Sequence, residues 1–265
     1  MVVRPSAVAG QFYSADPDHL RKQISDLLAN VSTPVDNIPK ALIAPHAGYV
    51  YSGATAAEAF ASLRGGAHTI TRVVLIGPAH YVHVRGIAAP TVDAFETPLG
   101  RVPVDKSALD VIADLPFVIQ DDLAHAPEHA LEVELPFLQT LLVSFRVVPL
   151  LVGDATPKEI AHVLLKLWDR PGTLVVVSSD LSHYHDYETA RHLDAATAAV
   201  IERGDWANLG PHQACGSRAL AGLLLETGRR GLKIRRLSLC NSGDTAGSRD
   251  RVVGYGAWMF AQMVA

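Results

Sequence analysis

The stretch ALIAPHAGYVYSG, residues 41–53, decides the fold, because it has the pattern of a buried strand, a turn and the start of a helix. Residues 41–44 are apolar throughout, which is typical of a strand covered on both faces. Pro45 and Gly48 then interrupt the strand, and residues 53–63 carry apolar side chains at three- and four-residue spacing. A strand that leads directly into a helix is the repeating unit of an α/β sheet.

The same alternation continues to the C-terminus. Further buried strands are expected at residues 73–76, 146–152, 174–177, 234–239 and 252–260. Further helices are expected at residues 128–142, 157–168, 187–203 and 217–226. The pattern predicts one α/β domain over residues 1–265, in which a mostly parallel sheet lies between two helical layers in an α/β/α arrangement.

Composition and charge exclude several functions. The chain has 265 residues, of which 49% are hydrophobic, and its 23 basic and 27 acidic residues give a net charge of -4 without blocks of one sign. We therefore expect no nucleic-acid partner and no membrane association. Two cysteines, Cys215 and Cys240, are too few for a disulfide framework, and the N-terminus lacks a signal peptide, so we expect a cytoplasmic protein.

Histidines follow three of the expected strands. His46 comes just after the first strand, His80 after the second, and Asp180 and His183 after the strand at 174–177. Ligands of open α/β sheets bind beyond the carboxyl ends of the strands, so we expect these side chains to share one pocket. Each histidine alone would be as typical of a structural role, but three together favour a metal site with His46 and His80 as ligands.

The segment EHALEVELPF, residues 128–137, is expected to open a helix. His129 and Glu132 would then share one face, where they could orient ligands or move protons, while Glu134 would point elsewhere. Pro136 would distort such a helix. Cys215, just before the helix expected at 217–226, is interpreted as a small packing residue.

The ordered set of motifs resembles the Memo-like proteins. It consists of Phe12-Tyr13, APHAGY (44–49), GPAH (77–80), EHALE (128–132) with LPF (135–137), SSD (178–180) with His183, Cys215-Gly216 and SGD (242–244). Bacterial and archaeal relatives are often labelled component B of the AmmeMemoRadiSam system. The resemblance implies a fold like that of the class III extradiol, LigB-type dioxygenases, and a functional link to the other components of that system, including a radical SAM protein.

The resemblance also implies a ligand set. The pocket would be built from the C-terminal loop and the positions already named: His46, His80, His129, Glu132, Asp180 and His183. Animal members of the family are expected to hold iron or copper with two histidines and a cysteine, but Thr245 stands at that cysteine's position. Asp244 is therefore expected as the third ligand, with Cys240 as the less favoured substitute. Iron or copper is expected, and zinc is less favoured.

Three functions fit this reading. The favoured one is a non-haem, metal-dependent oxidoreductase in which His183 acts as acid and base, with Asp180, His129 and Glu132 assisting. The alternatives are a non-catalytic module that binds a peptide or small metabolite in the same pocket, and a metal-dependent hydrolase that uses zinc-bound water. The identity of the small-molecule or peptide ligand does not follow from the sequence.

Overall fold

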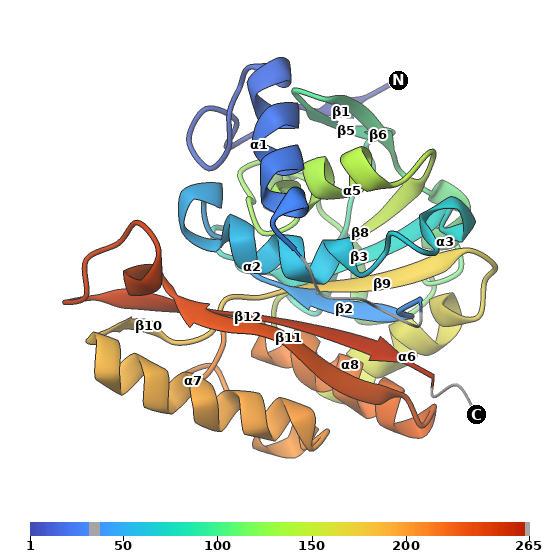
Figure 1. Ribbon diagram of the computed structural model, residues 1–265. Coiled ribbons are helices and arrows are strands. Elements are labelled where there is room, and N and C mark those ends of the chain that lie inside the picture. Colours follow the sequence, from blue (N-terminus) through green and yellow to red (C-terminus); the bar gives the residue numbers. More distant parts are fainter. Residues whose placement is uncertain (32–37, 263–265) are drawn as a thin grey trace.

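A mixed sheet lies between two layers of helices in the computed structural model, which describes residues 1–31 and 38–262 (Figure 1). At its centre four parallel strands lie side by side. They are, in spatial order, β2 (Ala41–Ala44), β9 (Thr173–Ser178), β3 (Arg72–Pro78) and β8 (Arg146–Val152). Nearly all of their residues are buried, as their apolar composition requires. The expected α/β fold with a mostly parallel sheet is confirmed.

Antiparallel strands extend this core on both sides. Next to β2 lies β12 (Val252–Ala261), which pairs with β11 (Lys233–Asn241) along its other edge and with β10 (His183–His185) at its start. Beyond β8 lie β4 (Ile87–Ala89) and β7 (Val118–Gln120). A separate small sheet contains β1 (Val3–Arg4), β5 (Ala94–Thr97) and β6 (Gly100–Pro103). Of the strands outside the central four, only β11 and β12 were expected. The others are short and have no strong hydrophobic pattern.

The helices cover both faces of the sheet. One face carries α1 (Pro17–Ala29), α2 (Tyr49–Ala61) and α5 (Leu135–Leu141), and the other carries α6 (Pro157–Trp168), α7 (Tyr187–Glu202) and α8 (Ser217–Arg229) (Figure 1). Short turns of helix are α3 (Lys106–Leu109), α4 (Asp122–His125), η1 (Ala67–Thr69), η2 (Glu132–Glu134), η3 (Trp206–Asn208) and η4 (Ser242–Asp244). The start of α6 is fixed by a capping box between Thr156 and Glu159.

The prediction of a helix at residues 128–142 is wrong for the first half of that range. Residues 126–131 are irregular, η2 is one 3₁₀ turn, and the regular helix α5 begins only at Leu135. Pro136 lies in the first turn of α5, where the missing N–H of proline costs no hydrogen bond. The proline therefore marks the start of a helix, and His129 and Glu132 do not share a helical face.

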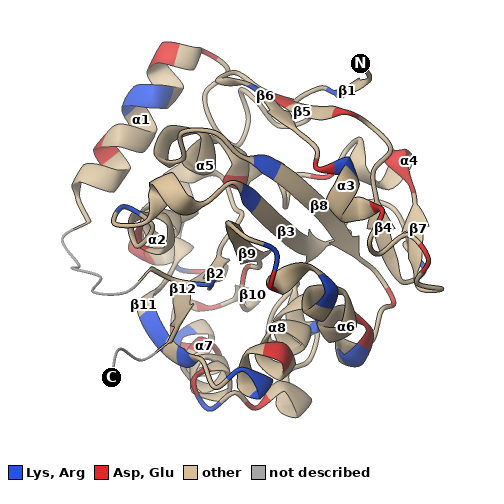
Figure 2. Ribbon diagram, turned by 90° about the vertical axis from the view of Figure 1, so that its right-hand side faces the viewer, with Lys and Arg blue, Asp and Glu red and all other residues tan. Residues whose placement is uncertain are grey.

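Charged residues of both signs are scattered over the outer helices, whereas the central strands carry few (Figure 2). Neither sign gathers into a stripe in this view. None of the helices within residues 1–31 and 38–262 is long and apolar enough to cross a membrane.

Candidate metal centre

A cavity of about 640 Å³ opens at the carboxyl edge of the parallel strands. Its walls come from the segments that follow β2, β3 and β9, from the N-terminal segment and from the loop between η4 and β12. The side chains that line it include those of His46, His80, His129, Asp180, His183, Tyr184 and Arg251. The cavity therefore lies where ligands of open α/β sheets bind.

The structure brings three imidazoles together in this cavity. The ring centroids of His46 and His80 are 5.2 Å apart, and the ring of His129 lies 5.4 Å from His46 and 4.7 Å from His80. Burial, and then the neighbouring His80, lower the pKa of His46 to about 3. His46 is therefore neutral at physiological pH, as a metal ligand must be. His183 and Asp180 line the same cavity.

Glu128 fixes the orientation of His80. Its carboxylate accepts hydrogen bonds from His80 Nδ1 at 2.8 Å, from the His80 backbone N–H at 2.6 Å and from the Ala130 N–H at 3.0 Å. Burial alone would raise the pKa of Glu128, but the hydrogen bonds from His80 and Ala130 hold it at about 2. Because the ionised carboxylate keeps a hydrogen on Nδ1, the lone pair of His80 is on Nε2.

Two buried groups position His46. Ser178, the last residue of β9, places its Oγ 2.7 Å from His46 Nδ1. Asp180 accepts a hydrogen bond from the His46 backbone N–H at 2.8 Å. Burial raises the pKa of Asp180, although this hydrogen bond and the nearby histidines oppose the shift. Asp180 thus holds the backbone of the loop after β2, in addition to lining the cavity.

Cys215 lies next to His46, which the sequence did not indicate. Its Sγ is 3.4 Å from His46 Nε2 and accepts a hydrogen bond from the Asp180 N–H at 3.3 Å. Burial, followed by the charge of Asp180, raises the pKa of the thiol to about 12. The interpretation of Cys215 as a plain packing residue is therefore incomplete. Its position beside the imidazole arises because the loop before α8 folds back over the end of β9.

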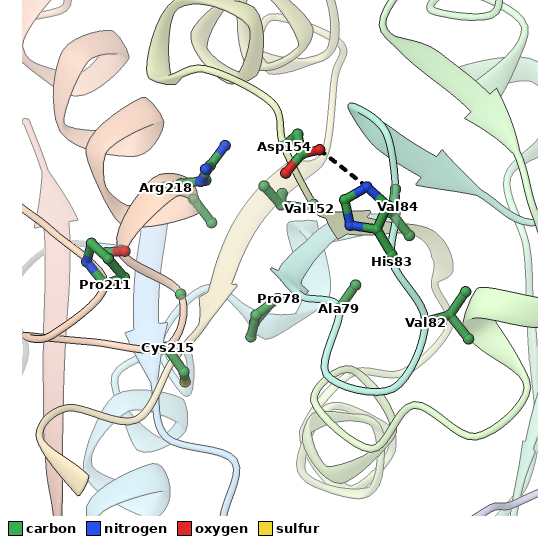
Figure 3. A pocket seen from close by; sticks show the side chains of 14 residues that line it. Pro78, Ala79, Val82, His83, Val84, Val152, Asp154, Pro211, Cys215 and Arg218 are labelled. Carbon is green, nitrogen blue, oxygen red and sulfur yellow. Dashed lines mark ion pairs between the residues drawn. The ribbon is translucent and has the colours of Figure 1, made fainter.

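Cys215 does not line the large cavity but a second, smaller pocket of about 250 Å³ (Figure 3). Figure 3 shows the thiol at one end of this pocket, with Pro78 and Ala79 between it and the ion pair of His83 and Asp154. The nitrogen and oxygen of that pair are 3.3 Å apart, and both side chains are more than half exposed. Cys215 therefore opens to this smaller pocket, and it meets the larger cavity only through its contact with His46.

The two residues considered as the third ligand lie elsewhere. Asp244 is exposed, and its carboxylate accepts hydrogen bonds from Tyr187 and the Asn241 N–H. Cys240 contacts Thr55 at 3.0 Å. Neither joins His46 and His80 among the groups of close ligand atoms in the described residues. The structure does not support either of them as the third ligand, because the turn η4 directs Asp244 back onto its own capping box.

Glu132 is a structural residue. It is fully buried and accepts hydrogen bonds from Arg4, Tyr13 and the N–H groups of Ala7 and Val8. Its carboxylate thus neutralises a buried arginine and holds the N-terminal segment against the sheet. The expected catalytic role of Glu132 is not supported, since it does not line the cavity.

The donor atoms fit a transition metal. Ligand atoms of His46, His80 and Cys215 all lie within 4.8 Å of one another, and so do those of His80, Glu128 and His129. Metal–nitrogen bonds of about 2.0–2.1 Å and a metal–sulfur bond of about 2.3 Å would put two ligands of a tetrahedral ion roughly 3.6 Å apart. The observed 3.4 Å between His46 Nε2 and Cys215 Sγ is close to that value. Coordination deprotonates a thiol, so its high pKa is no obstacle to a strongly bound ion.

Comparisons with known proteins agree with these motifs. The sequence matches the Memo-like protein family over residues 4–259. It is 34% identical to a MEMO1 family protein of Aquifex aeolicus over 274 aligned residues, which cover 98% of this chain and 100% of the relative. It is 36% identical to a MEMO1 family protein of Aeropyrum pernix, with 97% and 99% of the two chains covered.

The fold also occurs among solved structures. An uncharacterized protein from Escherichia coli K12 superimposes with a TM-score of 0.50 at 16% sequence identity, covering 82% of this chain and 98% of the other. At this identity the likeness concerns the fold alone.

Proposed function

This chain belongs to the Memo-like protein family, and on that premise we propose that it is a metal-dependent oxidoreductase acting on a small organic molecule. Iron or copper would be held by Nε2 of His46 and Nε2 of His80. Cys215 is the third ligand that we favour in place of Asp244, because its Sγ already lies 3.4 Å from His46. The observation that carries the proposal is the close approach of these three ligand atoms.

The surroundings of the two histidines support a ligand role. Glu128 orients His80, and Ser178 contacts His46 through its Nδ1. Metal-binding histidines almost always have such a partner on the second ring nitrogen. Histidines that only cap strand ends would not need ligand atoms within 4.8 Å of each other and of a cysteine sulfur. The arrangement therefore favours coordination over a purely structural role.

The remaining residues of the cavity would handle the substrate. A bound iron or copper ion would supply one-electron redox chemistry. His183, which is partly exposed on the cavity wall, is placed to give or take a proton. A volume of about 640 Å³ has room for a small organic molecule, and Arg251 at the mouth would favour an anionic one.

Oxidation is preferred to hydrolysis because of the resemblance to the LigB-type dioxygenases. A thiolate ligand suits copper, iron and zinc better than the hard ions bound by oxygen, so it narrows the choice of metal but does not separate oxidation from hydrolysis. The functional link to a radical SAM protein and a cytoplasmic location stay predictions from the sequence.

Elemental analysis after anaerobic, chelator-free purification tests the metal site. We expect the wild type to retain iron or copper, and the His46→Ala and His80→Ala variants to lose it. His19→Ala, which removes an exposed histidine of α1, is the matched control and is expected to keep the metal. A wild type that retains no metal after reconstitution, or equal retention by all three variants, overturns the proposal.

Oxygen consumption then separates the functions that share this site. With iron or copper bound, a panel of catechols and other small oxidisable acids is expected to include at least one that raises oxygen uptake. Retention of zinc alone, with ester hydrolysis and no oxygen uptake, would favour the hydrolase. Tight binding of a small molecule without turnover at any metal loading would favour the non-catalytic module.

A further inference from the structure

Three polar atoms surround the hydroxyl oxygen of Ser178, which is fully buried. The Ala130 carbonyl oxygen lies 2.6 Å from this Oγ, His46 Nδ1 lies 2.7 Å from it, and Glu134 Oε1 lies 2.9 Å from it. A hydroxyl has one hydrogen to donate and two lone pairs that accept. Only one of the three neighbours can therefore receive a hydrogen from Ser178, and the other two must donate to it.

The Ala130 carbonyl has to be the receiver. A carbonyl oxygen cannot donate, and at 2.6 Å two oxygens without a hydrogen between them would repel each other. His46 Nδ1 and Glu134 Oε1 must then each carry a hydrogen and point it at Ser178 Oγ. The count of hydrogens thus fixes two protonation states that the heavy-atom positions alone do not show.

The surroundings of Glu134 agree with a neutral carboxyl group. The side chain has no exposed surface, and its second oxygen, Oε2, has no hydrogen-bond partner. A carboxylate ion in such a place would be very costly, whereas a neutral acid is much less so. Burial raises the pKa of Glu134 well above its ordinary value; the contact with Ser178 opposes this shift only in part, and Asp180 adds to it. The buried cation Arg4 is paired with Glu132.

We propose that Glu134 is a positioning residue: a neutral carboxylic acid that, through Ser178, keeps the hydrogen of His46 on Nδ1. The lone pair of His46 is thereby left on Nε2, the atom that faces Cys215. The value of this arrangement for metal binding rests on the proposed function, but the hydrogen positions belong to the metal-free protein as well. This role differs from the expectation from sequence that Glu134 points away from the site.

The two histidines reach the same tautomer by different means. His80 donates to Glu128, which is ionised, because hydrogen bonds hold the pKa of Glu128 at about 2. His46 donates instead to a hydroxyl whose remaining acceptor position is filled by Glu134. The partly exposed His80 is thus oriented by an ionised carboxylate, whereas the fully buried His46 is oriented by neutral groups. This arrangement avoids placing an unpaired anion in the interior.

Substitutions at residue 134 separate a neutral donor from an anion. The amide of Glu134→Gln can donate the same hydrogen bond to Ser178 but cannot carry a negative charge. Glu134→Met fills a similar space without a donor. Ser178→Ala removes the relay itself. We expect Glu134→Gln to behave like the wild type, and the other two to lose the preference for one tautomer of His46.

Nitrogen-15 NMR of the histidine rings in metal-free protein tests the relay directly. The wild type and Glu134→Gln are expected to show a protonated Nδ1 and an unprotonated Nε2 at His46, and Ser178→Ala a mixture of tautomers. Infrared spectra should also show a protonated carboxyl band that Glu134→Gln lacks. A wild type with hydrogen on Nε2 of His46, or without that infrared band, overturns the inference even if every variant fails to fold.

Cobalt(II) titration, followed by visible absorption, measures what the relay contributes to metal binding. Affinity is expected to fall about 10- to 100-fold in Ser178→Ala and Glu134→Met, and to be unchanged in Glu134→Gln. Equal losses in Glu134→Gln and Glu134→Met would contradict a neutral donor. A wild type with the expected tautomer that binds no metal would leave the relay standing and refute the proposed function instead.

Discussion

Replacing Glu128 with glutamine should weaken metal binding while leaving the fold intact. The pKa of Glu128 lies at about 2 against an ordinary 4.5, after burial has already worked in the opposite direction. That difference corresponds to roughly 3 kcal/mol of favourable interaction with its donors. Three donors share it, and the hydrogen bond from the His80 side chain is the largest contribution. About 1–2 kcal/mol therefore remains for orienting the imidazole.

An interaction of this size corresponds to a loss of about 10-fold or slightly more in metal affinity, at the lower end of the range for partners of metal-binding histidines. The assay is cobalt(II) titration of Glu128→Gln beside Glu188→Gln, a control that changes a largely exposed glutamate of α7. Urea unfolding of both variants checks the fold. Wild-type affinity in a folded Glu128→Gln protein would refute the role given to this carboxylate.

Three further outcomes follow from buried groups. Glu132→Gln should lower the free energy of unfolding by about 3–5 kcal/mol, because it leaves Arg4 without its partner, and any folded fraction should still bind metal; equal stability to wild type would disprove the structural role. Burial lowers the pKa of His125 to about 4, so the unfolded chain binds an extra proton between pH 6.5 and 4 and stability falls as the pH falls. In His125→Gln the loss of unfolding free energy between pH 6.5 and 4 should be smaller by on the order of 2–3 kcal/mol. Chemical denaturation at several pH values measures this loss, and a loss equal to that of the wild type would contradict the prediction. Cys215→Ser should bind copper or cobalt more weakly and Cys240→Ser should not, so equal titration curves would exclude the thiol as a ligand.

The strands could be predicted because burial leaves a direct trace in the sequence. The apolar runs at 146–152 and 174–177 coincide with β8 and β9 to within a residue, since a strand covered on both faces tolerates almost no polar side chain. The helix expected from Glu128 failed because apolar spacing alone cannot show that Pro136 starts a helix rather than bending one.

The site could be predicted only in part. His46 and His80 were identifiable because each directly follows a core strand, and parallel strands deliver their ends to one edge. Ser178, Glu134 and Cys215 were not, because their roles depend on contacts between residues that are 35 to 169 positions apart in sequence. Glu132 shows the opposite error, since its polar character beside His129 suggested chemistry where the fold uses a buried ion pair.

The most direct test of the central claim is anomalous diffraction from crystals of the iron- or copper-loaded protein, recorded at the absorption edge of the metal. The account predicts one strong peak about 2.0–2.2 Å from Nε2 of both His46 and His80, with Cys215 Sγ within about 2.3 Å. A fully loaded crystal with its peak elsewhere, or touching only one of the two imidazoles, would contradict it.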